Sequence, residues 1–401
     1  MKIAVLKATE AGESRVAATP DTVKKFIAAG VSIEVEADAG AGSAISDAEY
    51  KAAGATIAKT AKDAMKDAAV ILAVRRPEKL ADFPKGAAVV ALMDPYGNEA
   101  ALAELAKAGL SALSLELIPR ITRAQVMDVL SSQANLAGYQ AVIEAAAHYG
   151  RAMPMMMTAA GTVPAARVFV MGAGVAGLQA IATARRLGAV VTATDVRPAA
   201  KEQVESLAAK FVAVEDDEFR EAETAAGYAK EMSKEYQAKQ AELVRTHIAK
   251  QDIVITTALI PGRPAPRLID QAMVKSMRDG SVIVDLAVER GGNVEGAKPD
   301  KVVDAGGVSI IGYQNMAGRI AASASALLAR NILAFVEPMI DADTKALSIN
   351  REDEIIAATL LTHDGAVVHP DFAQIAKTPG KKAAKKAAKT KGAEPSEEGD
   401  D

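Results

Sequence analysis

A glycine-rich run is the part of the sequence whose residue types and spacing most directly indicate chemistry. The run GAGVAG occupies residues 172–177, directly after a β-rich stretch at 167–171 and before a helical pattern at 178–187. In that context the first glycine permits a tight turn, the second lets a pyrophosphate approach the backbone, and the third lets helix and strand pack. The helix N-terminus attracts the phosphates. The predicted cofactor contacts in this run are Gly172, Gly174, Val175 and Gly177.

An acidic residue follows where a dinucleotide site needs one. Asp195 ends the next β-rich stretch, 18 residues after Gly177. Its carboxylate would accept hydrogen bonds from the ribose hydroxyls and repel a 2′-phosphate, which favours NAD(H) over NADP(H). Arg197 could pair with a phosphate, brace Asp195 or stack on the adenine. We predict that Asp195, Val196 and Arg197 contribute to the cofactor site.

The second group of candidate residues lies in one long helical pattern, which runs without proline from residue 121 to about residue 149. Gln125, Asp128 and Ser132 fall on one side of the predicted helix, with Ser131 at its edge. Polar residues at this spacing either form a wetted face or line a site. The spacing alone leaves both interpretations open.

Two arginines and three apolar residues bear on that choice. Arg120 and Arg123 stand at the predicted start of the helix, where the helix dipole disfavours cations, so they suggest an anionic partner. Val126, Val129 and Leu130 indicate that the helix packs against the rest of the chain.

The elements that must position these residues form two α/β series. Short β-rich runs alternate with helical patterns over residues 2–118 and again over residues 167–311, which is typical of parallel sheets. Six predicted strands favour a doubly wound second domain. The predicted strands are residues 3–6, 32–35, 70–74 and 88–92 in the first series, and 167–171, 190–194, 211–214, 252–258, 281–286 and 308–311 in the second.

A last apolar helical pattern, residues 321–336, is expected to return the chain to the first domain. The predicted fold class is therefore α/β, with two Rossmann-like parallel-sheet domains, the second inserted into the first. The predicted domains are residues 1–137 plus 321–375, residues 138–320, and a disordered tail at 376–401 that is rich in lysine and alanine and then acidic.

The composition excludes several classes of function. The 401 residues carry 47 basic and 51 acidic side chains, for a net charge of −4, with only 7 Phe, 7 Tyr and no Trp. No positive field draws this chain to nucleic acid, and few rings could stack on bases. The absence of cysteine excludes disulfides, thiolate nucleophiles and iron–sulfur clusters. No apolar run of about 18 residues indicates a membrane span.

The common hydrolase and metal motifs are also missing. The chain has no HExxH, no GxSxG and no EF-hand run, and its four histidines, at 148, 247, 363 and 369, are scattered. We therefore predict no metal site. His148 follows a run of alanines near the end of the long helical pattern, which favours a packing or helix C-terminal role over that of a base.

A charged stretch interrupts the second series. Between residues 215 and 245, 14 of 31 residues are charged, and Gly227-Tyr228 breaks the helical character. The stretch is long enough to be a functional loop, and a pair of solvated surface helices is the alternative.

Several of these motifs together resemble those of a known family. The glycine run, the triplet at 195–197 and the segment PRITRAQVMDVLSSQANLAGY at 119–139 closely resemble the NAD(H)-binding α-subunit component of proton-translocating nicotinamide nucleotide transhydrogenases. MMMTAAGTVP at 155–164 and TTALIPG at 256–262 match the same pattern. The resemblance covers about residues 1 to 372.

The resemblance implies roles for the second group of residues. Arg120 and Gln125 would contact the carboxamide and phosphate region of the dihydronicotinamide nucleotide, while Asp128 and Ser131 would fix its ring. Arg123 would belong to the cofactor site.

It also implies a role for the charged stretch, because residues around Gly227 match the family's mobile loop, which closes over bound nucleotide. Tyr228 would be the lid residue, with Gln240 and Leu259 lining the site.

The transhydrogenase component is related in fold to alanine dehydrogenase. Segments around Arg15 and Arg75 resemble those that hold the substrate carboxylate in that enzyme. Its catalytic histidine would be expected near residues 93–96, where this chain has Met-Asp-Pro-Tyr, so Asp94 would have to replace it. Oxidation of an amino acid needs a base, whereas hydride passing between two nicotinamide rings does not.

The resemblance therefore implies a dimeric component that binds NAD(H) and passes hydride to NADP(H) on a partner. The expected partners are a membrane-spanning subunit of the second α type and a β subunit that carries the NADP(H) domain. The expected location is the cytoplasm, at the inner face of the membrane. The alternatives are an amino-acid dehydrogenase of the alanine type and a non-catalytic NAD-binding adaptor.

Overall fold

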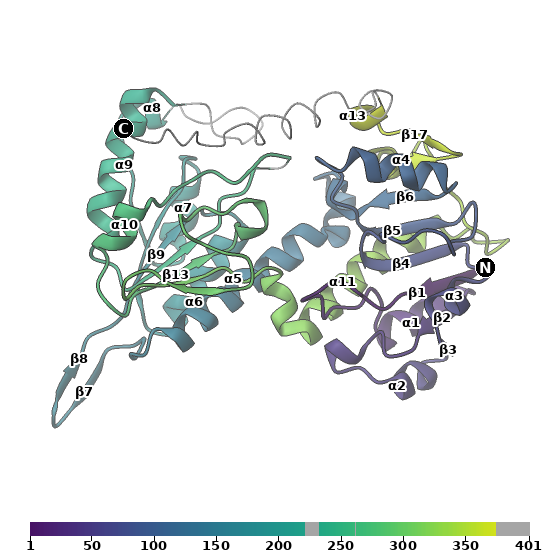
Figure 1. Ribbon diagram of the computed structural model, residues 1–401, viewed down its shortest axis with the longest axis horizontal. Coiled ribbons are helices and arrows are strands. Elements are labelled where there is room, and N and C mark those ends of the chain that lie inside the picture. The colour runs from purple at the N-terminus through teal and green to yellow at the C-terminus, as the bar shows by residue number, and fades with distance from the viewer. Residues whose placement is uncertain (221–231, 261, 374–401) are drawn as a thin grey trace, which may run out of the picture.

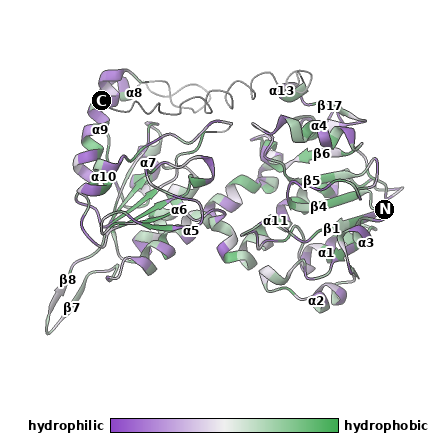
Figure 2. Cartoon of the chain, viewed as in Figure 1, coloured by the Kyte–Doolittle hydropathy of each residue, from purple (hydrophilic) through white to green (hydrophobic). Residues whose placement is uncertain are grey.

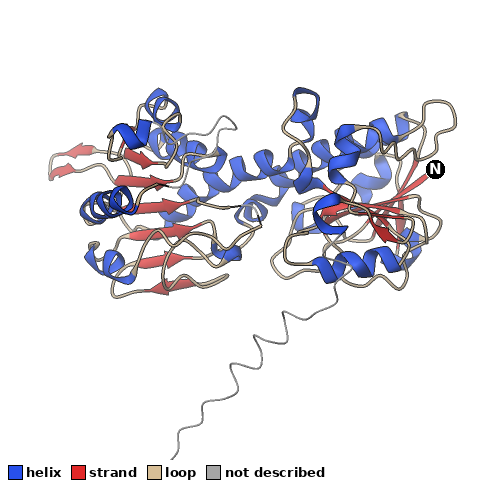
Figure 3. Ribbon diagram, turned by 90° about the horizontal axis from the view of Figure 1, so that it is seen from above, coloured by secondary structure: helices blue, strands red, loops and turns tan. Residues whose placement is uncertain are grey.

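Two α/β lobes joined by long helices make up the computed structural model of this chain (Figure 1), which describes residues 1–220, 232–260 and 262–373. Seen at right angles, the two sheets lie at opposite ends of the molecule with helices running between them (Figure 3). Hydrophobic residues concentrate in the strands, while helices such as α9 (Lys234–Ile248) contain many hydrophilic residues (Figure 2).

The first lobe is built on a six-stranded parallel sheet with the order β3-β2-β1-β4-β5-β6. Its strands are β1 Lys2–Val5, β2 Ser32–Glu36, β3 Thr56–Ala58, β4 Val70–Arg75, β5 Ala88–Leu92 and β6 Ser111–Ser114. The order reverses between β1 and β4, which is the topology of a doubly wound sheet. Apart from Lys2 and Arg75 at their ends, both central strands are buried, so their residues are apolar without alternation.

The second lobe has a seven-stranded sheet with the order β11-β10-β9-β12-β13-β15-β14, in which only β14 is antiparallel. Its strands are β9 Arg167–Met171, β10 Val190–Thr194, β11 Lys210–Phe211, β12 Ile253–Thr256, β13 Val282–Asp285, β14 Val302–Asp304 and β15 Ser309–Ile311. The predicted doubly wound second sheet is confirmed. The sequence patterns missed β3, β6 and β14, which are three or four residues long.

Helices cover these sheets. In the first lobe they are α1 Pro20–Ala28, α2 Asp47–Ala52, α3 Ala61–Met65 and α4 Glu99–Lys107, with α12 Glu354–Thr359 and α13 Pro370–Ala373 near the end of the chain. In the second lobe they are α6 Val175–Arg186, α7 Ala200–Ser206, α8 Asp217–Arg220, α9 and α10 Gln271–Ser276. The connecting helices are α5 Val129–His148 and α11 Ala321–Val336.

The start of the long connecting helix differs from the prediction. Residues Thr122–Met127 form a 3₁₀ segment, and α5 begins only at Val129 because Asp128 leaves the helical conformation and caps it. Gln125 and Asp128 therefore do not share a face of one α-helix. Of the three residues expected to pack, only Val129 is buried, while Val126 and Leu130 are 66% and 51% exposed.

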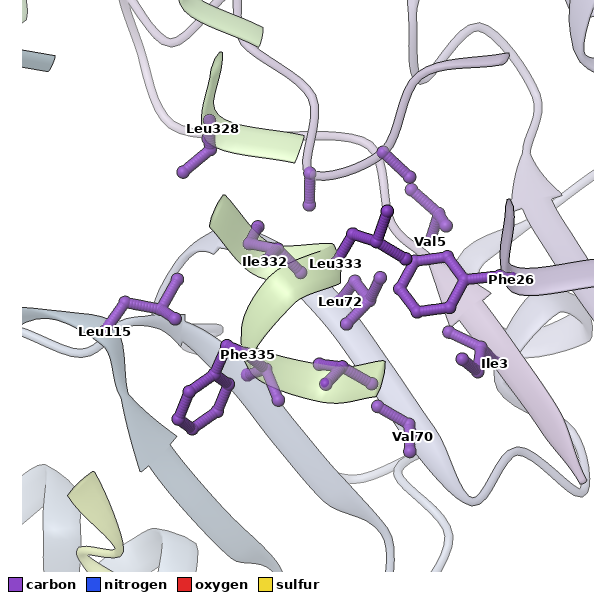
Figure 4. Close-up of a cluster of buried hydrophobic side chains, with 14 of the residues drawn as sticks. Ile3, Val5, Phe26, Val70, Leu72, Leu115, Leu328, Ile332, Leu333 and Phe335 are labelled. Atoms are coloured by element: carbon purple, nitrogen blue, oxygen red, sulfur yellow. The ribbon is translucent and has the colours of Figure 1, made fainter. Parts of the chain in front are cut away.

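Helix α11 returns the chain to the first lobe. Leu328, Ile332 and Phe335 pack there against strand residues that include Ile3 and Leu72 (Figure 4). The predicted insertion of the second domain is confirmed by this packing. The exact residue boundaries stay a prediction, and residue 138 falls inside α5, which contributes Val129 to one core and Val142 to the other.

The same helix carries the one segment in the described residues that is long and apolar enough to cross a membrane. Met316–Met339 passes that test by length and composition, although the sequence predicted no such run. In this structure 56% of its apolar window is buried, and its large apolar side chains from Leu328 to Met339 belong to the first core. Such a segment is therefore accounted for as a core helix.

Candidate functional site

A cleft of about 630 Å³ lies between the two lobes. It opens at the carboxyl ends of strands in both sheets, because its wall includes Arg75 at the end of β4, Asp94 beyond β5 and Thr257 beyond β12. Ala176 of α6 and Leu130 of α5 close its sides. This is the edge at which doubly wound sheets bind ligands.

The glycine run forms the turn between β9 and α6 beside that cleft. Gly172 has φ +106°, a left-handed conformation that L side chains avoid, and an added Cβ would lie 2.5 Å from Thr257 Oγ1. A Cβ on Gly177 would lie 1.8 Å from the Gly172 carbonyl oxygen, so the helix can approach the turn only with glycine there. A Cβ on Gly174 would meet nothing within 4 Å. The space above Gly174 is thus open for a ligand.

The structure also shows a glycine that sequence reasoning missed. A Cβ on Gly138, in the middle of α5, would lie 2.0 Å from the Ala176 carbonyl oxygen of α6. Its absence lets the two helices touch backbone to backbone at the first turn of α6. A lone glycine inside a helical pattern was the signal that could have found this contact.

Asp195 lies against the glycine turn. Its Oδ2 accepts a hydrogen bond from the Ala173 N–H at 2.7 Å, and its Oδ1 accepts from the Arg197 N–H at 2.9 Å. The Arg197 guanidinium also donates from Nε to Oδ1 at 3.0 Å and from Nη2 to Oδ2 at 3.2 Å. Of the three roles that the sequence left open for Arg197, this structure shows the bracing of Asp195.

We expect Asp195→Asn to weaken NADH binding and to reduce the preference of the site for NADH over NADPH. The substitution removes the charge that strengthens hydrogen bonds to ribose hydroxyls, a change of about 2 kcal/mol or roughly thirtyfold in Kd. It also removes the charge that repels a 2′-phosphate. Fluorescence titration gives the Kd of the variant for NADH and for NADPH. An unchanged ratio of these two Kd values would contradict the assignment of Asp195 to the ribose.

The other residues predicted from the sequence to bind the cofactor lie in several different places. Gln240 is held within the second lobe, where its Nε2 donates to Thr194 Oγ1 at 3.2 Å and its Oε1 accepts from the Val214 N–H at 2.9 Å. Leu259 lines the cleft, while Val175 and Val196 are exposed. Gly227 and Tyr228 lie outside the described residues.

The second group of candidates stands next to the cleft rather than in its wall. Ser131 donates to Asp128 from its N–H at 2.8 Å and from its hydroxyl at 2.6 Å, so the structure brings these two side chains together at the start of α5. Gln125 and Arg120 are exposed. The residues of α5 that line the cleft are Val129, Leu130, Gln133, Ala134 and Ala137.

Arg123 is placed differently from its neighbours. Its guanidinium pairs with Asp353 at 3.0 Å and with Glu354 at 3.3 Å, at the start of α12. This contact ties the 3₁₀ segment to the C-terminal part of the first lobe, and Arg123 is not part of the cleft wall.

A buried carboxylate is the feature of the cleft that the sequence analysis did not single out. Glu13, whose side chain is 1% exposed, accepts hydrogen bonds from Arg15 at 2.7 and 2.8 Å and from Arg75 at 3.0 Å. Burial alone would raise the pKa of Glu13, but the hydrogen bonds and positive charge of Arg15, together with Arg75, outweigh it and lower the pKa to about 2. The two arginines that resemble carboxylate ligands thus already hold a carboxylate of the chain itself.

Contacts across the cleft link the lobes. Asp94, at φ +47°, forms an ion pair with Arg290 of the second lobe. Arg75 also pairs with Glu289 at 3.3 Å, and Asn315 donates to Glu13 at 3.0 Å. Asp94, which would have to replace the catalytic histidine of an alanine dehydrogenase, is therefore engaged in an ion pair with the Arg290 guanidinium.

Comparison with known proteins places these features in a family. Residues 4–137 match the alanine dehydrogenase/PNT N-terminal domain, and residues 141–370 match the C-terminal domain of the same family. The first component of the NAD(P) transhydrogenase alpha subunit of Rhodospirillum rubrum is 53% identical over 377 residues, which cover 92% of this chain and 98% of that protein.

Solved structures agree with this match. A transhydrogenase from Sinorhizobium meliloti superposes with a TM-score of 0.84 and 61% identity, over 92% of this chain and all of that one. An L-alanine dehydrogenase superposes with a TM-score of 0.78 and 26% identity, over 94% of this chain and 99% of that one. With both domains matched along nearly their whole length, the chain belongs to the alanine dehydrogenase/PNT family.

Proposed function

We propose that this chain is the NAD(H)-binding component of a proton-translocating NAD(P) transhydrogenase. The observation that carries the proposal is the glycine turn at the cleft edge, with open space above Gly174 and the Asp195 carboxylate beside it. The N-terminus of α6 would hold the pyrophosphate, and Asp195 the adenosine ribose. The transhydrogenase relatives support the same assignment.

The residues of the cleft wall are compatible with hydride exchange. When bound, NAD(H) would supply the hydride carrier, and hydride exchange between nicotinamide rings moves no proton at the reacting carbons. No general base is needed, and no histidine is found among the described residues of the cleft wall. The work left to the protein is to position the ring and exclude water, which we assign to Arg120, Gln125, Asp128 and Ser131.

An apolar rim beside the cleft fits a partner domain. Val126, Leu130, Leu259 and Ile260 are large apolar side chains that are 44% or more exposed. Leu130 and Leu259 line the cleft from the two lobes, and Val126 and Ile260 lie close to them in the sequence. An exposed apolar patch of this kind marks an interaction site. We propose that an NADP(H)-carrying domain of a β subunit docks here, so that its nicotinamide faces the one held by this chain.

A projecting hairpin supports the proposed homodimer. Strands β7 Met156–Thr158 and β8 Gly161–Val163 form an arm that stands away from both lobes (Figure 1). Its apolar residues Met155, Met156 and Met157 are exposed, which is costly in water unless a second copy covers them. Membrane-spanning α-type and β subunits would hold the dimer at the cytoplasmic face of the membrane.

Hydride exchange tests the proposal directly. We expect the purified chain to transfer hydride from NADH to an oxidised nicotinamide analogue only when the NADP(H)-binding domain of a β subunit is added. Gln125→Asn should then lower the transfer rate by about tenfold to a hundredfold with little change in NADH affinity. The shorter side chain would no longer hold the nicotinamide ring in the orientation that hydride transfer requires. Unchanged transfer in this variant would remove Gln125 from the site.

An alanine-type dehydrogenase is the second candidate, favoured by Arg15 in the cleft wall and by the likeness to L-alanine dehydrogenase. Against it, Glu13 and Glu289 balance the charges of Arg15 and Arg75. Incubation with L-alanine and NAD, without a partner, distinguishes the two. Turnover there would move catalysis to Asp94 and overturn the transhydrogenase assignment.

A further inference from the structure

Asn331 is a buried polar side chain on a helix whose packed face is largely apolar. Its neighbours Leu328 and Ile332 on α11 belong to the first core, and Asn331 itself is only 8% exposed. A buried amide destabilises a fold unless both its N–H and its carbonyl groups have hydrogen-bond partners. The partners of Asn331 therefore show what this side chain holds in place.

The two ends of the Asn331 amide contact two different elements. Its Nδ2 donates to the Val126 carbonyl oxygen at 2.7 Å, and its Oδ1 accepts a hydrogen bond from the Ser132 hydroxyl at 2.7 Å. Val126 lies in the 3₁₀ segment Thr122–Met127, and Ser132 lies in the first turn of α5. The chain leaves the helical conformation at Asp128, between the two contacts. One side chain of α11 therefore spans the break between the 3₁₀ segment and α5.

Both contacts lie one residue away from side chains that we assign to the nicotinamide ring. Gln125 directly precedes Val126, and Ser131 directly precedes Ser132. The Gln125 side chain is exposed, so its direction is set by the backbone that carries it rather than by packing around it. A hydrogen bond to the Val126 carbonyl oxygen restricts that backbone.

Two other contacts of the 3₁₀ segment fix its direction less well. Ala124 and Met127 are buried in the first core, but apolar packing has no directional preference. Arg123 pairs with the start of α12, but its side chain is 49% exposed, and exposed ion pairs contribute little. The hydrogen bond from Asn331 is both buried and directional.

We propose that Asn331 is a positioning residue for hydride transfer, which holds the 3₁₀ segment at the angle to α5 that orients the nicotinamide ring. This inference rests on the proposed function, because Gln125 and Ser131 orient a ring only if NAD(H) binds beside them. Asn331 is not part of the cleft wall and acts through the backbone of its partners. Small displacements of orienting groups lower a rate strongly, while binding through other contacts is kept.

Asn331→Leu tests the proposal, since leucine has the same number of side-chain heavy atoms but forms no hydrogen bond. In the full chain, at a saturating concentration of the NADP(H)-binding domain, we expect hydride transfer from NADH to fall about tenfold or more. The Kd for NADH should change less than about threefold, because the glycine turn and Asp195 hold the rest of the dinucleotide.

Hydrogen exchange gives a second measurement, which does not depend on activity. In Asn331→Leu the amides of residues 119–131 should exchange about tenfold faster or more than in the wild type, because the 3₁₀ segment has lost its buried hydrogen bond. Ser132→Ala removes the other contact of Asn331 and serves if Asn331→Leu fails to fold. It should lower the transfer rate about threefold or more, again with little change in the Kd for NADH.

Thr362→Val is the matched control. Thr362 is fully buried, and its hydroxyl donates to the Leu110 carbonyl oxygen at 2.7 Å and accepts from the Ala112 N–H at 3.1 Å. These contacts lie at the amino end of β6, whereas the cleft opens at the carboxyl ends of the strands. We expect Thr362→Val to lower the free energy of unfolding without changing hydride transfer or the exchange of residues 119–131.

The outcomes separate this inference from the function on which it rests. A wild-type chain that transfers no hydride would overturn the proposed function and, with it, the role of Asn331. Transfer by the wild type and equal transfer by folded Asn331→Leu would overturn the role of Asn331 alone. Unchanged exchange of residues 119–131 in Asn331→Leu, or an equal loss of transfer in Thr362→Val, would overturn it as well.

Discussion

Gly174→Ala is expected to weaken NADH binding while leaving the fold nearly as stable as before. An added Cβ meets no protein atom within 4 Å, so nothing in the folded chain opposes it. The same Cβ would occupy the space through which the pyrophosphate reaches the backbone. We expect an affinity loss of about 2 kcal/mol, roughly thirtyfold. The free energy of unfolding should change by about 1 kcal/mol or less, the cost of alanine at a helix N-cap.

Gly177→Ala is the matched comparison, because its Cβ would lie 1.8 Å from the Gly172 carbonyl oxygen. Backbone must move to accept it, so both the free energy of unfolding and NADH affinity should fall, the former by about 3 kcal/mol. Urea unfolding and NADH titration of the two variants separate a ligand-contact role from a packing role. Equal affinity in wild type and Gly174→Ala would contradict a dinucleotide at this turn.

The second large effect is expected at Glu13. Glu13→Gln keeps the shape of the side chain but removes its negative charge. Arg15, which is 4% exposed, and the half-buried Arg75 then lack the carboxylate that balances their positive charges. Breaking a buried ion pair from one side costs about 3 kcal/mol. The matched control is Asp82→Asn, which breaks an ion pair with Lys62 whose side chains are 50% and 74% exposed, and should change stability little.

The stabilisation by Glu13 depends on pH with a definite sign. Its pKa is about 2 in the folded chain, below the ordinary value of 4.5, so the unfolded chain binds the proton more readily. The contribution is complete above about pH 4.5 and is lost as the pH falls from there through about 2. The difference in unfolding free energy between wild type and Glu13→Gln should shrink over that window. A difference that stayed constant from pH 7 to pH 2.5 would contradict an ionised Glu13.

The sequence predicted the sheets well because their central strands are buried on both faces. A continuous apolar run such as the one in β4, followed by a helical pattern, is typical of a parallel α/β unit and fits few other structures. The short strands β3, β6 and β14 carry too few residues for a pattern to stand out. The helix start at Val129 was missed because Asp128 could either continue the helix or cap it, and only its hydrogen bonds to Ser131 decide.

The sequence by itself determined the glycine turn and its acidic residue, because strand, turn, helix and Asp195 lie within one local βαβ unit whose geometry is fixed by neighbouring residues. Only the tertiary structure decided what happens in the cleft. Glu13 meets Arg75, and Asp94 meets Arg290, across long stretches of chain that no periodicity connects. The contact of Asp94 with Arg290 depends on how α5 and α11 hold the two lobes together. The contact of Glu13 with Arg15 and Arg75, which lowers the pKa of Glu13 against the effect of burial, exists only once the first lobe is folded.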